Sequence, residues 1–205
     1  SSTECSRPIE LIGGGTEGNT AVALGRLGLP VVFHGMVGAD GQGRFLKADL
    51  EREGIDTTHL LFHPEAFTMQ AIALIEPDGD RHLRAWPGLD RVAWIRLQTE
   101  DVPLAQIRAA GWFHTSGTNL VAYPLIDAIL LAMETARAAG VPVSLDINLR
   151  RYSYTDVFRR AFDRALELAD VVMVSGTDEM PFVTAPGTPE EMSRRLSGGK
   201  RTVVA

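Results

Sequence analysis

A strand–helix unit repeats through the second half of this chain and constrains the fold more than any other feature. Short apolar runs of strand type begin near residues 112, 143, 171 and 202, and a segment with apolar residues at helical spacing follows each of the first three. The repeat is roughly 30 residues long, which is the length of a β-α-β unit. Strands that alternate with helices predict an α/β fold with a parallel sheet covered by helices on both faces.

The first half of the chain has a different pattern. Residues 19–28 and 43–54 show helical spacing, and residues 30–38 form an apolar run of strand type. Two extended runs joined by a Pro-Asp-Gly-Asp turn sequence predict a β-hairpin over residues 67–86. A hairpin inside an alternating chain indicates strands outside the main sheet. We therefore expect a small β lid there, with residues 7–13 as its second element.

Composition and charge fit one globular domain over residues 1–205. Apolar residues make up 45% of the chain and charged residues 22%, close to the average for a globular protein. The net charge of −6 argues against a nucleic-acid or membrane surface, because both need clustered Lys and Arg, and no apolar run is long enough to span a membrane. The single cysteine, Cys5, cannot form an internal disulfide, so we expect a cytoplasmic protein.

A glycine-rich stretch between residues 13 and 18 permits more than one kind of site. It satisfies the G-x-G-x-x-G pattern after a strand-type run over residues 9–12, and this pattern places a pyrophosphate on a helix N-terminus. An NAD(P)-dependent oxidoreductase is therefore one alternative. Such a site also needs an acid at the end of its second strand. Here that strand ends in Gly38, and Asp40 has the sequence context of a helix cap.

The other interpretation centres on Gly14, Gly15 and Asn19. Paired glycines let a ligand approach the backbone without a Cβ in the way. An asparagine at the head of a helix can cap the helix, or its amide can bond a hydroxyl group. The local sequence thus leaves two options open, a site for a polyhydroxylated substrate and a simple turn with an asparagine cap.

The order of several segments resembles the ribokinase or PfkB family of carbohydrate kinases. The resemblance runs from about Gly13 to the end of the chain, through GGTEGNTAVALGRLG, VVFHGMVGADGQGRFLKADLEREGID, FTMQAIALIEPDGDR, FHTSG, SLDINLR and VVMVSGTDE. It implies a ribokinase-like layered sheet with a lid. It also implies ATP-dependent phosphorylation of a sugar or nucleoside hydroxyl, with Mg²⁺ as a second cofactor, and a homodimer that would form through the lid.

The resemblance implies roles for particular residues as well. Substrate binding would fall to Gly14, Gly15, Asn19, Asp146, Asn148 and Arg150. The last three follow a strand-type run, and the carboxyl ends of parallel strands are where open α/β sheets bind ligands. Glu179 would be the acid of the metal site, because Mg²⁺ prefers carboxylate oxygens. Gly38 and Asp40 would form a mainly structural turn.

The chain also departs from the family pattern. Glu17 stands where the family carries a small residue, and Gly176 stands where the metal motif has an asparagine. Two segments are absent, the early strand with the first sugar-binding aspartate and the Gly-Ala-Gly-Asp segment that carries the catalytic base. We therefore expect a chain truncated at both ends, inactive by itself and without a catalytic residue. The whole protein would be a kinase or a non-catalytic binder of a sugar or nucleoside.

Two histidines, His59 and His63, lie four positions apart in the sequence. On a helix they would face the same way and suit a metal ion. Because Pro64 follows His63 directly, we expect a strand or loop here and no metal site.

Overall fold

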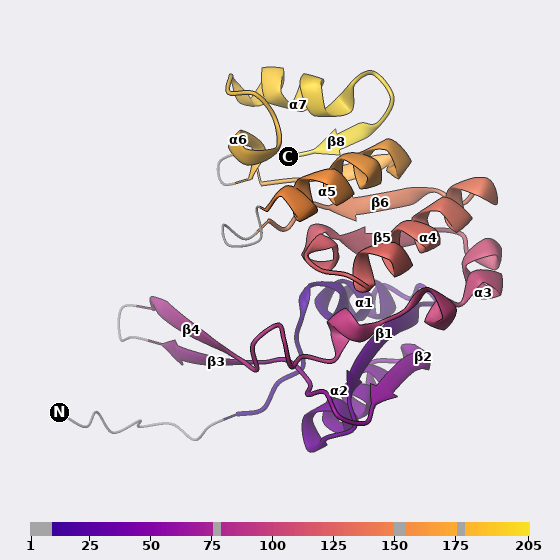
Figure 1. Ribbon diagram of the computed structural model, residues 1–205, viewed down its shortest axis with the longest axis vertical. Helices are drawn as coiled ribbons and strands as arrows, with labels where there is room; N and C mark the ends of the chain where they lie inside the picture. Colours follow the sequence, from indigo (N-terminus) through magenta and orange to yellow (C-terminus); the bar gives the residue numbers. More distant parts are fainter. Residues whose placement is uncertain (1–9, 76–78, 150–154, 176–178) are drawn as a thin grey trace.

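The second half of the chain forms a four-stranded parallel sheet in the computed structural model, which describes residues 10–75, 79–149, 155–175 and 179–205. The strands are adjacent in the order in which they occur along the chain (Figure 1), and they are β5 (Phe113–Ser116), β6 (Val143–Asp146), β7 (Val171–Met173) and β8 (Thr202–Val204). Ser116 lies opposite Asp146, and Asp146 lies opposite Met173. The predicted strand positions are confirmed, and the carboxyl ends of the strands lie along one edge.

Three helices of this half follow the predicted pattern, α4 (Leu125–Ala138), α5 (Asp156–Leu168) and α7 (Pro189–Ser197). Two short helices that were not predicted, α3 (Leu104–Ala109) and α6 (Met180–Val183), are also present. Helix α4 stops just before Gly140, whose φ of 74° lies in the left-handed region that glycine adopts readily. Helix α7 begins with a capping box, in which Thr188 and Glu191 each accept a main-chain N–H from the other.

The main core lies between the four-stranded sheet and its helices. Helices α4 and α5 pack against each other beside the sheet (Figure 1). Strand residues Val143 and Leu145 are fully buried against helix residues Met133 and Phe158, all at 0% exposure. Burial of an aliphatic or aromatic side chain of this size contributes about 1.5–3 kcal/mol. The sheet edge is therefore held by a rigid interior.

A second, smaller parallel sheet forms in the first half. Helix α1 (Thr16–Arg26) leads to β1 (Val32–Gly38), and α2 (Gly41–Arg52) leads to β2 (Asp56–His63), which pairs in parallel with β1. Among the described strands, β1 and β2 pair only with each other, so the single sheet that we expected is divided into two. Two short 3-10 helices, η1 (Trp94–Arg96) and η2 (Thr99–Asp101), lie between β4 (Arg81–Trp86) and α3. A third, η3 (Gly117–Leu120), follows β5.

Residues 10–13 differ from the expectation of a strand over 9–12 and a lid element over 7–13. They have no regular secondary structure, and residues 7–9 lie outside the described residues. Leu11 and Ile12 are 61% and 81% exposed. An extended run so short needs a paired strand or a core to stabilise it. No described strand supplies one, so the apolar pattern alone does not produce a strand.

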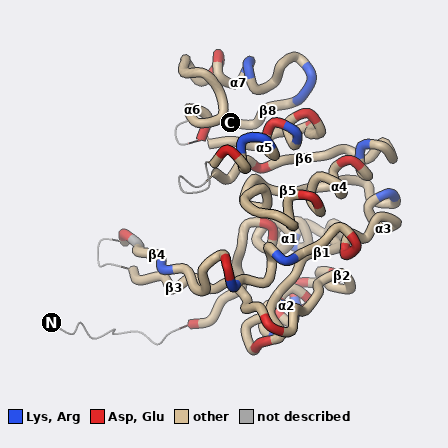
Figure 2. The backbone as a smooth tube through the Cα atoms, viewed as in Figure 1, with Lys and Arg blue, Asp and Glu red and all other residues tan. Residues whose placement is uncertain are grey.

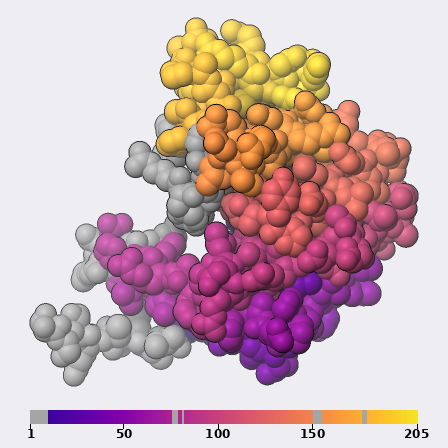
Figure 3. Space-filling view, viewed as in Figure 1, coloured from indigo at the N-terminus to yellow at the C-terminus, as the bar shows by residue number. Residues whose placement is uncertain are grey.

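The predicted hairpin is confirmed. Strands β3 (Gln70–Ile75) and β4 (Arg81–Trp86) pair antiparallel, from Gln70 opposite Trp86 to Ile75 opposite Arg81. The hairpin projects from the body of the molecule (Figures 1 and 3). Its apolar side chains are largely uncovered, since Ile72 is 60% exposed and Leu83 55% exposed. Such a projecting, apolar element has the character expected of a lid.

Charged residues are dispersed over the fold. Figure 2 shows basic and acidic positions interspersed along the described chain. The described helices include none with the length and apolar character needed to cross a lipid bilayer.

Candidate functional site

The glycine loop in front of α1 leaves its backbone open to a ligand. Gly15 is the residue before the helix, with φ 94° and ψ 149°, a conformation that favours glycine. Gly14 is different, because its φ is not in the left-handed region. A Cβ built at Gly14 would meet no atom of the described residues within 4 Å. Neither packing nor backbone conformation therefore requires glycine at position 14, and the loop is open on that side.

The alternative of a turn capped by asparagine is wrong. Asn19 lies in the first turn of α1, its main-chain N–H bonds to the carbonyl oxygen of Gly15 at 2.9 Å, and its side chain is exposed. No described side chain caps the start of α1. The amide of Asn19 is thus placed beside the glycine loop and the start of a helix, where main-chain N–H groups lack an acceptor within the helix.

Asn148 connects the strand ends to this loop. It follows β6 by two residues and has φ 38°, a left-handed conformation that costs free energy in a residue other than glycine. Its amide Nδ2 donates to Oγ1 of Thr16 at 3.1 Å and to Oδ2 of Asp146 at 3.5 Å. The structure therefore brings Asp146 and Asn148 together with the first residue of α1. Arg150, the third residue of this predicted group, lies outside the described residues.

Close packing fixes the neighbouring strand end. A Cβ at Gly117, directly after β5, would lie 2.1 Å from the carbonyl oxygen of Ile147. Ile147 itself is fully buried, and its N–H bonds to the carbonyl oxygen of Met173 at 2.9 Å. The turns that follow β5, β6 and β7 thus touch one another at the edge where Asn148 lies.

A polar cluster around Glu17 was missed by the sequence analysis, which noted this residue only as unusual. Its Oε1 accepts hydrogen bonds from Nδ2 of Asn119, at 2.7 Å, and from the hydroxyl of Ser116. Ser116 is fully buried and ends β5, and its hydroxyl also meets that of Thr118. The sequence does contain a signal for this cluster. Hydroxyl and amide residues (Ser116, Thr118 and Asn119) stand at the end of a predicted strand, and an acid, Glu17, stands in the glycine-rich stretch.

His114 lies two residues before Ser116 on β5. The hydroxyl of Ser144 accepts a bond from Nε1 of Trp112 at 2.8 Å and lies 2.8 Å from Nδ1 of His114. Burial lowers the pKa of His114, and the negative charges of Glu17 and Asp146, which raise it, do not cancel that effect. The ring is therefore neutral at pH 7 and does not supply positive charge to the site.

Glu179 has main-chain partners. Its Oε1 accepts the N–H of Leu149 at 2.7 Å, and its Oε2 accepts the N–H of Ser175 at 2.8 Å. Over the described ranges, no three His, Cys, Asp or Glu side chains gather where they could hold a metal ion. A metal role for Glu179 stays a prediction, because Mg²⁺ needs only one or two protein carboxylates. Gly176, at the other end of the expected metal motif, lies outside the described residues.

Asp40 is a structural residue, as expected. It caps α2, its Oδ1 accepting the N–H of Gly43 at 2.7 Å, and its Oδ2 accepts the N–H of Thr68 at 2.9 Å. Burial by itself raises the pKa of Asp40, but the hydrogen bonds donated by Thr68 and Gly43 outweigh it, so the pKa lies below its usual range. Because this carboxylate is already committed to the fold, it is a poor partner for the ribose of a dinucleotide.

The two histidines lie on strand β2, as expected from Pro64. Nδ1 of His63 accepts the N–H groups of Glu65 and Ala66, at 3.1 and 3.0 Å. Four residues along a strand separate two positions by about 13 Å. His59 and His63 therefore do not share a ligand.

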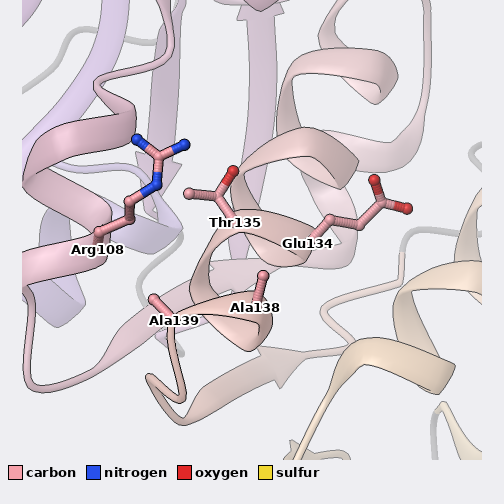
Figure 4. Close-up of a pocket in the computed structure, with 5 residues that line it drawn as sticks. All are labelled: Arg108, Glu134, Thr135, Ala138 and Ala139. Carbon is pink, nitrogen blue, oxygen red and sulfur yellow. The ribbon is translucent and has the colours of Figure 1, made fainter.

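One surface hollow lies away from the glycine loop. It has a volume of about 300 Å³ and is lined by Arg108, Glu134, Thr135, Ala138 and Ala139 (Figure 4). These residues belong to α3 and to the last turns of α4. A helix between parallel strands ends where the next strand begins, so this hollow is at the amino edge of the sheet. Glu134 pairs with Arg164 at 2.7 Å, and Arg108 is the other charged residue in the lining.

Comparisons with known proteins identify relatives of this chain. The model of the pfkB family carbohydrate kinases matches residues 6–205. The fructokinase of Salmonella typhimurium is 32% identical over 176 residues, which are 84% of this chain and 55% of that enzyme. The 5-dehydro-2-deoxygluconokinase of Geobacillus thermodenitrificans is 33% identical over 168 residues, 81% of this chain and 49% of that enzyme. The chain spans about half the length of these two relatives.

A solved structure with bound ligands has the same fold. It is the fructokinase of Vibrio cholerae O395 in its fructose, ADP and calcium ion bound form. The TM-score is 0.78 and the sequence identity 29%, and the match covers 93% of this chain and 61% of that one. The α/β fold expected from the strand–helix repeat is confirmed by this likeness.

Proposed function

This chain belongs to the pfkB family of carbohydrate kinases, and on that premise we propose that the protein containing it transfers the γ-phosphoryl group of ATP to a hydroxyl of a sugar or sugar derivative. The fructokinases and the 5-dehydro-2-deoxygluconokinase among its relatives support a substrate of this class. A dinucleotide site would also need a free acid for the ribose, and Asp40 is committed to capping α2. The open glycine loop therefore supports a sugar as the ligand.

One contact carries the proposal, the hydrogen bond from Asn148 to Thr16. It joins two segments that lie 132 residues apart and that both carry groups suited to hydroxyls. The carboxylate of Asp146 accepts hydrogen bonds from sugar hydroxyls, and the amides of Asn19 and Asn148 both donate and accept them. We assign substrate binding to these three residues and to the backbone of Gly14 and Gly15.

Arg150 completes the proposed substrate site. The assignment rests on its position in the sequence, two residues after Asn148. A guanidinium group there would suit an acidic or phosphorylated part of the substrate, because it binds such groups through two parallel hydrogen bonds. Together these residues bind and orient the hydroxyl that reacts, which is a large part of the catalysis of phosphoryl transfer.

The phosphoryl donor and cation are proposed from the relatives. ADP and calcium are bound in the structure of the V. cholerae fructokinase, which supports ATP and a divalent cation such as Mg²⁺ for this protein. When bound, Mg²⁺ neutralises charge on the phosphate oxygens. The 205 residues contain no Gly-Ala-Gly-Asp segment, so we propose that they bind the sugar but do not phosphorylate it by themselves.

Two further assignments complete the proposal. The uncovered apolar side chains of the β3–β4 hairpin, among them Ile72 and Leu83, support a homodimer formed through the lid. A chain with one cysteine requires no oxidising compartment, which supports a place in the cytoplasm.

The test is a comparison of the full-length protein with residues 1–205. Each is incubated with ATP, Mg²⁺ and one of four acceptors, D-fructose, D-ribose, 5-dehydro-2-deoxygluconate or adenosine, and ADP release is followed. We expect ADP release with at least one sugar from the full-length protein and none from residues 1–205. Sugar binding by the full-length protein without ADP release would identify a non-catalytic binder. NADH binding without any response to sugars would favour the oxidoreductase.

A further inference from the structure

We infer that Glu179 is a positioning residue of the sugar site, which holds Asn148 in place through main-chain hydrogen bonds. The inference rests on the proposed function, in which Asn148 binds the sugar. What it adds is the role of a residue that the family resemblance would place at a cation.

The first step is the geometry of Glu179 itself. Its two carboxylate oxygens accept the N–H groups of Leu149 and Ser175, at 2.7 and 2.8 Å. These two residues follow neighbouring strands, β6 and β7. Hydrogen bonds to an ionised acceptor are stronger than those between neutral groups. Glu179 thus ties two adjacent strand-end turns together with one side chain.

The second step is how Glu179 is anchored. The next residue, Met180, is fully buried in the main core. The N–H groups of Glu179 and Met180 both lie 3.2 Å from the carbonyl oxygen of Ser175. The backbone of Glu179 is therefore fixed to the same turn that its carboxylate binds. A side chain held in this way keeps its acceptor oxygens in place when the surrounding turns move.

The third step leads to Asn148. This residue adopts φ 38°, which is unfavourable unless neighbouring contacts maintain it. On one side Asp146 ends strand β6, and on the other the N–H of Leu149 is bound by Glu179. Fixing that N–H fixes the peptide plane that joins Asn148 to Leu149. The side chain of Asn148 can then reach Thr16 and the glycine loop.

A positioning role and a metal role predict different effects of replacing Glu179 on sugar affinity and on the cation requirement. If Glu179 holds the turns, its replacement frees two main-chain N–H groups and weakens sugar binding even without a cation. If it binds a cation, its replacement raises the cation requirement and leaves sugar binding in the absence of metal unchanged. The first set of results is expected from the observed bonds, since each carboxylate oxygen already has a main-chain donor.

The experiment uses the full-length protein with Glu179→Gln, and Glu191→Gln as a matched control. Gln keeps the shape of Glu but turns an NH₂ group toward one of the two N–H donors. Glu191 also accepts a main-chain N–H, at 3.0 Å from Thr188, but lies on α7 away from the site. Amide hydrogen exchange is measured at Leu149 and Ser175. We expect exchange about tenfold faster in Glu179→Gln at one or both amides, and unchanged exchange in Glu191→Gln.

A second measurement tests whether sugar binding is weakened. The affinity for D-fructose is measured by calorimetry in EDTA without nucleotide, and we expect it to fall about tenfold in Glu179→Gln and to stay unchanged in Glu191→Gln. Unchanged exchange at both amides would overturn the inference, as would unchanged affinity together with a raised Mg²⁺ requirement. A wild-type protein that phosphorylates no sugar would instead refute the proposed function, and the exchange data would still decide whether Glu179 holds the two turns.

Discussion

The side-chain amide of Asn119 donates a hydrogen bond of 2.7 Å to the carboxylate of Glu17, across 102 positions of the chain. Glu17 belongs to the first turn of α1, and Asn119 belongs to the 3-10 turn directly after β5. No backbone ladder among the described strands joins the β1–β2 sheet to the β5–β8 sheet. This side-chain bond, with those of Ser116 to Glu17 and of Asn148 to Thr16, therefore helps to hold the glycine loop against the strand ends.

Replacement of Glu17 by alanine should destabilise the full-length protein by about 1–3 kcal/mol. The change removes the acceptor shared by Ser116 and Asn119, and Ser116 is fully buried, so its hydroxyl loses a partner it cannot replace with water. Glu17→Gln should cost less, because its carbonyl oxygen still accepts. Urea unfolding measures both, with Glu10→Ala as the control, since Glu10 is exposed and lies in no helix or strand. Equal stability of Glu17→Ala and Glu10→Ala would contradict the assigned role.

Replacement of Gly14 by alanine should weaken sugar binding without loss of stability. A Cβ at this position meets no described atom within 4 Å, so only a ligand would be obstructed. We expect KM for the sugar to rise about tenfold or more, with the melting temperature unchanged or slightly higher because alanine restricts the unfolded chain.

Gly111→Ala is the matched control for this change. Gly111 is also exposed, and a Cβ there also meets nothing described within 4 Å, but it lies before β5 at the opposite edge of the sheet. Its substitution should leave both KM and melting temperature unchanged. A similar KM in the two variants would remove the glycine loop from the site.

The sequence predicted the parts of the fold that depend on local patterns. The strand positions near 112, 143, 171 and 202 and the hairpin over 67–86 follow from patterns within short stretches of the sequence. The division into two sheets could not be read in this way. It depends on which strands find partners across the fold, and an apolar run has the same appearance in a sequence with or without a partner.

The candidate site was predictable only in part. The motifs placed Asp146 and Asn148 at a strand end and the glycines at a helix start, and the structure brings Asn148 to Thr16. The partners of Glu17 and the bond of Glu179 to Leu149 were not predictable, because these contacts join residues 30 to 102 positions apart. A carboxylate has the same appearance in a sequence whether it binds a metal, a sugar or a backbone N–H.

Stability should fall on acidification between about pH 6.5 and pH 4 because of His34. Burial lowers the pKa of His34 to about 4 from 6.5, although a hydrogen bond to the main chain of Asp101 raises it. Between these values the unfolded chain binds a proton that the folded protein does not, so the free energy of unfolding decreases as pH falls. The full window corresponds to a loss of about 3 kcal/mol.

Urea unfolding at several pH values checks this prediction. His34→Gln should flatten the pH dependence across the window, and His82→Gln, on the exposed hairpin, should leave it as in the wild type. The lowered pKa of His114 acts in the same direction, so some dependence should remain in His34→Gln. The same slope in all three proteins would exclude His34 as the cause.

The base of the lid hairpin should loosen when Thr68 loses its hydroxyl. Thr68 is 6% exposed, its Oγ1 accepts the N–H of Gly38 at 2.9 Å, and it donates to Asp40 at 2.8 Å. Thr68→Val keeps the shape but leaves both partners without that bond, so we expect a loss of about 1–3 kcal/mol and faster hydrogen exchange across β3 and β4.

Thr68→Ser supplies the control, because it removes a methyl group and keeps the hydroxyl. The exchange rates of the hairpin amides in Thr68→Ser should stay close to those of the wild type, even if the lost methyl group lowers stability by about 1 kcal/mol. Faster exchange in Thr68→Val alone would then identify the hydroxyl as the tether between Asp40 and the lid. Equal exchange in both variants would mean that the main-chain bond from Thr68 to Asp40, at 2.9 Å, is sufficient to hold the hairpin.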